Sequence, residues 1–315
     1  MIQNSLCSLL QLQYPIIQGG MVYASGYKLA SACSKAGILG VLGAGSMSLD
    51  ILEQQLIKLK KKVQDRPVAV NIPLLYSKVN EQVDLCLKHG IKIFITSAGS
   101  PKIFTKKLKE AGCTVLHVVS NDDLAAKCED AGVDAVIAEG FEAGGHNGRD
   151  ELTTLTLIPL VKKRVSIPVI AAGGIASGEA IAAMMVLGAD GVQMGTRFLM
   201  TQESSVHENY KNLLRESTSH STELVMKKVV PVRLWKNEFY QKIKKKEESD
   251  ATKEELVNLL GKGRARKGML EGDMVEGELE IGQVCGLIKD LPKVDDLVKD
   301  LVSQYNLALS RISKF

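Results

Sequence analysis

The chain has 315 residues, 45% hydrophobic and 24% charged, so it is long enough to bury a large core. Its formal net charge of +4 is small, and Lys and Arg alternate with acidic residues, which argues against a nucleic-acid-binding protein. No run reaches eighteen apolar residues and the first residues do not resemble a signal peptide, so we expect a cytoplasmic protein without a membrane span. Six scattered cysteines without C-x-x-C spacing predict buried free thiols and no metal site.

A repeated unit organises the first two hundred residues. Several amphipathic helical stretches end in a glycine that is followed at once by a short apolar run, and only 4% of the chain is aromatic. Because glycine suits the left-handed conformation that closes a helix, each unit predicts a helix, a cap and a buried strand. The capping glycines are Gly37, Gly90, Gly112, Gly132 and Gly188, and three more strands are expected at 15–18, 68–71 and 168–172. Eight such strands predict a (β/α)8 TIM barrel, with a doubly wound sheet as the alternative.

The pattern changes after residue 203, which predicts three parts: a barrel over 1–203, a helical lid subdomain over 204–277 and a C-terminal segment over 278–315. The lid is charged and shows no clear buried strand; its Lys-rich run at 241–249 fits a solvated helix face, with docking of an acidic partner as the alternative. The C-terminal segment has amphipathic spacing, so we expect a closing helix packed on the barrel. That spacing is set by Leu287, Leu291, Leu297, Leu301, Leu307 and Leu309.

A TIM barrel places its active site where the strands end, and those ends are rich here in small polar residues. The stretch 139–148 follows the apolar run 135–138 and combines two carboxylates, four glycines and His146, which predicts catalysis there. Glycine turns at 173–174 and 194–197 follow the seventh and eighth strands and would turn backbone N–H groups toward a phosphate. A phosphorylated cofactor or substrate is therefore predicted. The simpler explanation is that these glycines only permit tight turns.

Four ordered motifs carry a family resemblance: YPIIQGGM at 14–21, EAGGH at 142–146, PVIAAGGI at 168–175 and QMGTRF at 193–198. Together they resemble the flavin-dependent family that contains nitronate monooxygenases (2-nitropropane dioxygenases) and enoyl-acyl-carrier-protein reductase II enzymes. The resemblance covers nearly the whole chain. It implies a (β/α)8 barrel that binds FMN non-covalently, with the phosphate at the turns after the seventh and eighth strands.

The resemblance also implies roles for single residues. His146 matches the histidine that the family places over the substrate, as an acid, a base or an orienting group; the alternative is a side chain that only bonds to its own loop. The resemblance places FMN against Gly20, Met21, Asn71, Glu139, Gly144, Gly145, Gly173, Gly174, Gln193, Met194, Gly195 and Thr196.

Within the family, the sequence is closer to the enoyl reductases. Position 139 is Glu where many nitronate monooxygenases have Gln, and the segments 268–273 and 280–287 resemble the reductases. The resemblance then implies an oxidoreductase of fatty acid biosynthesis, in which NADPH or NADH reduces FMN and an enoyl thioester on acyl carrier protein takes the hydride. It also implies a monovalent cation at carbonyl-rich turns near Gly43 or in the C-terminal segment. Basic lid residues are expected to meet nucleotide phosphates or the carrier protein, namely Arg233, Lys236, Arg264 and Arg266.

Alternatives remain open at this point. A nitronate monooxygenase would oxidise a small nitronate with O2 on the same FMN. A phosphate-sugar isomerase would need no flavin and would leave Met21 and Asn71 unexplained, and a non-catalytic binding protein would not need His146. A polar insertion at 147–151 departs from the shorter link associated with many reductases and bears on how an acyl chain enters. The base rate for soluble proteins favours a homodimer.

Overall fold

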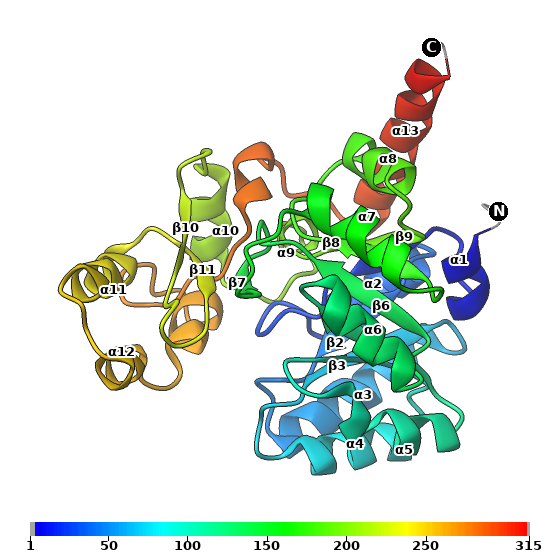
Figure 1. The fold of residues 1–315 in the computed structure, drawn as a ribbon, viewed down its shortest axis with the longest axis horizontal. Coiled ribbons are helices and arrows are strands. Elements are labelled where there is room, and N and C mark those ends of the chain that lie inside the picture. The colour runs from blue at the N-terminus through cyan, green and yellow to red at the C-terminus, as the bar shows by residue number, and fades with distance from the viewer. Residues whose placement is uncertain (1–3, 314–315) are drawn as a thin grey trace.

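The computed structural model describes residues 4–313 and contains eight parallel strands that form a barrel (Figure 1). The strands are neighbours in the order β1-β9-β8-β6-β5-β4-β3-β2, and a parallel bridge between Ile17 and Leu39 joins the two ends. This closure confirms the (β/α)8 prediction against the doubly wound sheet, which would keep two open edges. The strands are β1 (Ile16–Gln18), β2 (Gly40–Gly43), β3 (Val68–Pro73), β4 (Ile93–Ser97), β5 (Thr114–Val119), β6 (Ala135–Glu139), β8 (Val169–Ala172) and β9 (Gly191–Met194).

The predicted glycine caps are present at the ends of the barrel helices. All five have positive φ, from 69° at Gly112 to 102° at Gly188, which is the left-handed conformation that other residues adopt only with strain. Apolar side chains of the strands and helices fill the space between the two layers. The helices around the barrel are α2 (Tyr27–Lys35), α3 (Leu49–Val63), α4 (Val79–Lys88), α5 (Thr105–Glu110) after the short η1 (Pro101–Ile103), α6 (Asp122–Asp130), α7 (Thr154–Arg164), α8 (Gly178–Val186) and α9 (Thr196–Leu199).

The interior of the barrel is closed at its amino end by helix α1 (Ser5–Leu10). Leu6 and Leu10 of this helix are buried in the same cluster as the inward-facing strand residues. A Cβ added at Gly191 would lie 2.3 Å from Cδ2 of Leu6, so the strand approaches the plug only because it lacks a side chain there. The opposite, carboxyl end of the barrel is therefore the end that remains available for a ligand.

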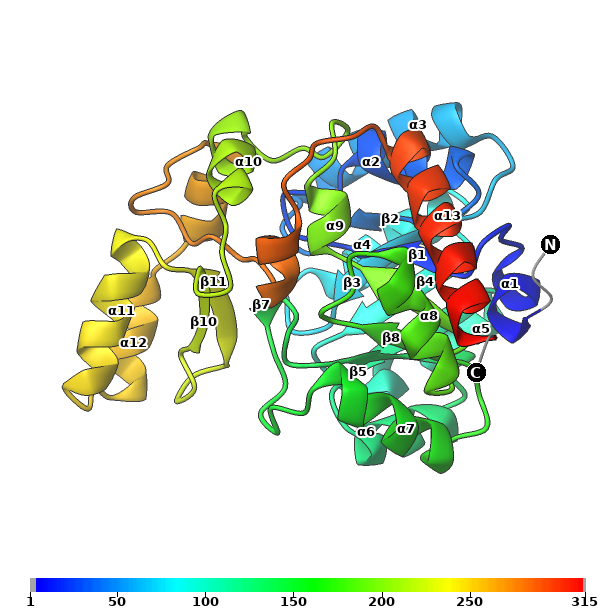
Figure 2. The same cartoon turned by 90° about the horizontal axis from the view of Figure 1, so that it is seen from above.

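The lid segment 204–277 contains helices and also a β-hairpin, so the expectation of no buried strand in it was wrong. Strands β10 (Thr222–Val225) and β11 (Val232–Trp235) are antiparallel, and the two-residue strand β7 (Gly145–His146) from the barrel completes their sheet (Figure 2). Each strand is too short to show a clear alternation within charged surroundings. The lid has an apolar core of its own that includes Phe239 and Ile243. Its helical elements are α10 (Glu208–Arg215), α11 (Glu238–Glu248), α12 (Lys253–Leu260) and the π-helical η2 (Arg266–Leu270).

The C-terminal segment returns from the lid to the barrel, through η3 (Gln283–Leu287) and helix α13 (Val294–Ile312), which packs along α8 and α2. Of the leucines expected to form its apolar face, Leu297 and Leu301 are buried, whereas Leu307 and Leu309 are exposed. Ala308 between them is the residue that continues the buried face, because 294, 297, 301 and 308 follow the helical period. Leu287 also points to solvent, from η3.

The state of the cysteines and the character of the helices can be described for residues 4–313. All six cysteines are free and buried, as their scattered positions predicted. Within the described residues, none of the helices has the length and apolar character that crossing a membrane requires.

Candidate functional site

A cavity of about 1110 Å³ opens at the carboxyl ends of the barrel strands and extends under the lid and the C-terminal segment. The residues that the sequence assigned to a cofactor line this cavity, with one exception. Met194 is buried among the helices outside the barrel, because its neighbour Gln193 takes the inward position on β9. Only its carbonyl group reaches the rim, where it accepts a hydrogen bond of 3.0 Å from the N–H of Gly19.

The turns after β8 and β9 form a cradle for an anion. Gly173 and Gly174 have φ of 93° and 71°, and Thr154 Oγ1 donates to the carbonyl of Gly173 at 2.9 Å, which fixes the turn. A Cβ added at Gly195 would contact only Met21, whose Sδ would lie 3.4 Å away. The chain then turns into α9 at Thr196, and the first N–H groups of a helix have no partner within the helix. This donor set fits a phosphate.

The loop after β1 is held by two buried side chains that the sequence analysis did not select. Gln18 Oε1 accepts from the N–H of Val41 at 3.0 Å, and its amide group donates to Ser25 Oγ at 2.8 Å. Ser25 Oγ accepts from the N–H of Met21 at 2.9 Å and donates to the carbonyl of Gly19 at 2.9 Å. These bonds keep the loop against the cavity. The only signal in the sequence was a Gln inside an otherwise apolar strand.

Polar side chains reach the cavity from three different strands. Asn71 on β3 donates through Nδ2 to the carbonyl of Ile95 at 3.3 Å, which leaves Oδ1 toward the cavity. Gln193 Oε1 on β9 is buried without a hydrogen-bond partner among residues 4–313. Burial raises the pKa of Glu139 on β6 to about 7. An unpartnered buried acceptor and a carboxyl group that protonates readily fit the polar edge of a heteroaromatic ring.

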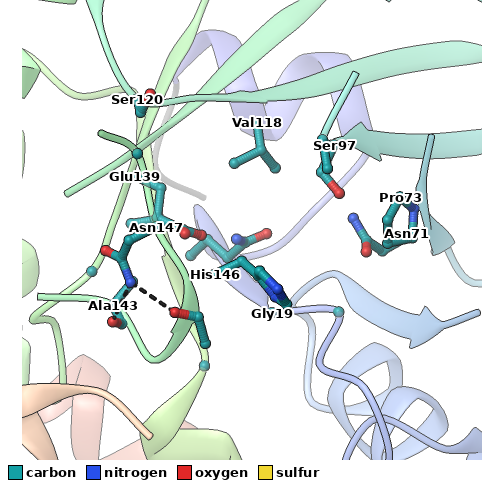
Figure 3. A pocket seen from close by; sticks show the side chains of 18 of the residues that line it. Gly19, Asn71, Pro73, Ser97, Val118, Ser120, Glu139, Ala143, His146 and Asn147 are labelled. Atoms are coloured by element: carbon teal, nitrogen blue, oxygen red, sulfur yellow. Dashed lines mark hydrogen bonds between the residues drawn. The ribbon is translucent and has the colours of Figure 1, made fainter. Parts of the chain in front are cut away.

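His146 projects into the cavity, and Figure 3 shows it between Glu139 and Gly19, with Asn71 on another side. Its side chain is exposed to the cavity and makes no hydrogen bond to any residue between 4 and 313. The alternative in which this ring only bonds to its own loop therefore finds no support. Asn147 performs that task instead: its Nδ2 donates to the carbonyls of Ala143 at 3.0 Å and Gly145 at 2.9 Å.

Strand β11 of the lid fixes the backbone that carries His146. Val232 pairs with His146 and Arg233 pairs with Gly145, antiparallel. The guanidinium group of Arg233 donates to the carbonyl of Phe141 from Nε at 3.1 Å and from Nη2 at 2.8 Å, and it lies 5.1 Å from the centre of the Phe141 ring. Arg233 is only 2% exposed, so it is a structural residue and cannot meet a nucleotide phosphate or carrier protein, contrary to the expectation.

The other basic lid residues are engaged within the lid. Lys236 lies 3.4 Å from Glu223, and Arg266 lies 2.9 Å from Glu271. Arg264 is 3.3 Å from Glu276 and 4.3 Å from the centre of the Phe239 ring. Side-chain exposure of Arg266 is still 62%, so of these three it is the one that solvent reaches most easily. Their main partners are neighbouring carboxylates.

The polar insertion after His146 contacts the hairpin of the lid. Arg149 donates to the carbonyls of Lys227 at 3.1 Å and Val229 at 2.7 Å, and Lys227 forms an ion pair of 2.5 Å with Glu151. The insertion thus fastens the loop of His146 to the lid. Asn147 at its start does line the cavity.

Two further cavity residues were not assigned a role from the sequence. Glu280 lies beside the strand of His146, because Leu234 of β11 forms an antiparallel bridge with it. Burial raises the pKa of Glu280, and the nearby His146 acts in the opposite direction. Burial lowers the pKa of His117 on β5 to about 4, so this ring is neutral at pH 7; its Nδ1 lies 2.6 Å from Thr96 Oγ1.

A closed (β/α)8 barrel with glycine turns, an ionisable side chain and a lid over the strand ends has the arrangement of a barrel enzyme. The family model "Nitronate monooxygenase" matches residues 3–304. The chain belongs to this family and is an oxidoreductase, which confirms the resemblance found in its four motifs.

Three relatives show how this chain sits within the family. The structure of FabK from Thermotoga maritima has a TM-score of 0.95 and 37% identity, and the match covers 100% of this chain and 99% of that one. A (3aS,4S,5R,7aS)-5-hydroxy-7a-methyl-1-oxo-octahydro-1H-indene-4-carboxyl-CoA dehydrogenase from Rhodococcus jostii is 31% identical over 99% of this chain and 97% of its own. A probable nitronate monooxygenase from Staphylococcus saprophyticus is 32% identical over 98% of this chain and 99% of its own. The similarity therefore extends to both branches.

Proposed function

We propose that the protein is an FMN-dependent enoyl-thioester reductase, which uses NADH or NADPH to saturate a trans-2-enoyl thioester on acyl carrier protein in fatty acid synthesis. The observation that carries this proposal is His146, whose ring enters the cavity free of protein hydrogen bonds among residues 4–313 while its backbone is fixed by β11. The likeness to FabK supports the reductase branch, and so does a relative whose name gives a carboxyl-CoA compound as its substrate.

The cavity offers a place for each part of FMN. The N–H groups around Gly174 and Thr196 would bind the phosphate, while Gln193 and Glu139 would meet the polar edge of the ring. Met21 would supply a soft apolar surface beside it. A bound flavin supplies two-electron chemistry, taking a hydride from the pyridine nucleotide and giving it to the β-carbon of the enoyl thioester.

His146 would act on the substrate from the lid side of the cavity. Its imidazole can donate a hydrogen bond to the thioester carbonyl, which stabilises negative charge that develops on that oxygen. It can also deliver the proton that the α-carbon requires. In balance, one enoyl thioester, one NAD(P)H and one proton give one saturated thioester and one NAD(P)+.

Nitronate monooxygenase is the second candidate. The Staphylococcus saprophyticus relative carries that name and matches almost the whole chain at an identity close to that of the dehydrogenase. On the same residues, His146 would serve as the base or orienting group for a small nitronate, and O2 would replace the pyridine nucleotide as the co-substrate.

Two steady-state assays on the purified protein separate the candidates. Anaerobic oxidation of NADH or NADPH is measured with and without a crotonyl thioester, and aerobic oxygen uptake is measured with propionate-3-nitronate. Thioester-dependent oxidation of the nucleotide without oxygen supports the reductase. Oxygen uptake that depends on the nitronate and needs no nucleotide would replace it with the monooxygenase.

Three further parts of the proposal need separate measurements. Sedimentation analysis tests the homodimer. Comparing turnover in K+, Na+ and a large organic cation tests a monovalent cation at the turns near Gly43. Spectral flavin content and mass analysis after denaturation test non-covalent FMN.

A further inference from the structure

The cavity extends beyond the region that the proposed FMN and His146 would occupy. Around the closed barrel, β4 stands opposite β9, since four strand positions separate them in either direction. The carboxyl ends of β4 and β5, with the segments that follow them, contribute residues 97–102 and 118–120 to the cavity wall, and α6 adds others. This part of the cavity, here called the β4–β5 arm, begins at the strand opposite β9, and β6 separates it from β8.

Two cations lie at the edge of the β4–β5 arm. Lys102 belongs to η1 and Lys127 to α6, and both line the cavity and are exposed to solvent. Neither forms an ion pair or a side-chain hydrogen bond with any residue between 4 and 313, unlike most lysines of the lid. The carboxylates that line the cavity come from elsewhere, on β6, its following loop and the C-terminal segment: Glu139, Glu142 and Glu280.

Apolar side chains accompany these lysines. Leu75 is 77% exposed and Leu124 is 39% exposed, and both line the cavity, together with Pro101 and Val118. Exposed leucines at the rim of a cavity indicate a surface that a ligand covers. A wall with apolar residues and two exposed cations at its outer edge fits an elongated ligand with an apolar stem and an anionic group at the far end.

We propose that Lys102 and Lys127 bind a phosphate group of a ligand other than FMN, either the thioester substrate or the pyridine nucleotide. The inference rests on the proposed function, because that function requires ligands besides the flavin. The phosphate of FMN is assigned to the cradle after β8 and β9, whereas Lys102 and Lys127 belong to the segments that follow β4 and β5. Two sources share this chemistry: the phosphopantetheine that carries the enoyl group, and the diphosphate of the pyridine nucleotide. Lysine binds such groups as a point charge.

The test compares two thioesters that differ only in the phosphate. KM and kcat are measured for crotonyl-phosphopantetheine, crotonyl-pantetheine and NADH with the flavin-loaded wild type and with the double variant Lys102→Ala/Lys127→Ala. We expect KM for one phosphate-bearing ligand to rise about tenfold at low salt, with kcat unchanged. KM for crotonyl-pantetheine should not change. Lys106→Ala is the matched control, because Lys106 is an exposed lysine of α5 that does not line the cavity.

Each outcome has a definite meaning. A rise confined to crotonyl-phosphopantetheine identifies the thioester as the source of the phosphate, and a rise confined to NADH identifies the nucleotide. Unchanged KM values for both overturn the inference. If the wild type reduces no enoyl thioester, the proposed function fails. The lysines are then judged by calorimetric titration of the oxidised holoenzyme with the same ligands, where equal affinities for wild type and double variant reject them.

Discussion

The cradle after β8 and β9 and the lid side of the cavity are built in opposite ways. The cradle uses short contiguous stretches, 173–174 and 195–196, whose glycines and N–H groups act where the chain turns. The lid side assembles β7, β11 and Glu280 from three distant parts of the sequence. A local turn needs only its own residues, whereas the position of His146 depends on the folding of the lid. Cofactor binding and turnover should therefore respond to different substitutions.

The largest expected effect is on the cradle. Gly174→Asp would place a carboxylate beside the proposed phosphate, and repulsion of a few kcal/mol should weaken flavin binding roughly a thousandfold. Flavin absorbance of the purified variant measures this. Gly132→Asp is the control, since Gly132 also has positive φ but faces open space away from the cavity. A yellow Gly174→Asp protein with normal turnover would show that the phosphate lies elsewhere.

His146→Ala should separate binding from catalysis. The side chain makes no structural hydrogen bond among residues 4–313, so flavin content and the thermal midpoint should be unchanged. Turnover should fall about a hundredfold, the lower part of the range for a positioned acid or base. His89→Ala, which removes only a partner of Glu53 on the outside of the barrel, is the control. Full turnover in His146→Ala would remove this histidine from the mechanism.

Arg233→Met tests whether the lid positions His146. The carbonyl of Phe141 would lose both donors, so the loop that carries His146 should loosen. We expect kcat to fall about tenfold with unchanged flavin content, because His146 is no longer held in one place. Lys236→Ala, in the same hairpin but ion-paired at the surface, should behave as wild type. Equal losses in both variants would indicate general damage to the lid.

The smallest effect concerns pH. A buried carboxyl group whose pKa is raised to about 7 is most stabilising when protonated, so Glu139 costs stability as the pH rises from about 4.5 to 7. In flavin-free protein, Glu139→Gln should flatten this dependence by about 1 kcal/mol, an amount reduced because the cavity admits water. Unfolding by denaturant at pH 5 and pH 8 measures it. An equal change in the free energy of unfolding between pH 5 and pH 8 for variant and wild type would mean that Glu139 ionises normally.

The sequence predicted the barrel because its signals are local. Each glycine cap and apolar run lies within a dozen residues, and the caps at Gly37 and Gly188 appear in the structure as expected. The position of the cavity could be predicted because the carboxyl ends of all barrel strands lie at one face. The resemblance assigned Met194 as a whole residue, yet strand alternation turns its side chain outward and leaves only its carbonyl at the rim.

The lid could not be predicted in the same way. Strand β11 has four residues, and one of its two partner strands is the two-residue β7. Segments this short show no periodic pattern from which the sheet could be predicted. Arg233 was expected to meet nucleotide phosphates or the carrier protein, since a charged residue is usually exposed. Its burial depends on a hydrogen bond to the carbonyl of Phe141, and only the fold brings that group near. Glu280 was noted only within the segment 280–287, and its place beside β11 depends on a bridge to Leu234 from a distant part of the sequence.

The most direct test of the account is the oxidative half-reaction. The bound flavin is reduced photochemically without oxygen, the protein is mixed with crotonyl thioester in a stopped-flow instrument, and flavin absorbance and the thioester product are followed. The account predicts rapid return of the oxidised flavin spectrum, one saturated thioester per flavin, and a rate about a hundredfold lower in His146→Ala. A flavin that stays reduced with the thioester and is reoxidised only when oxygen is admitted would contradict it.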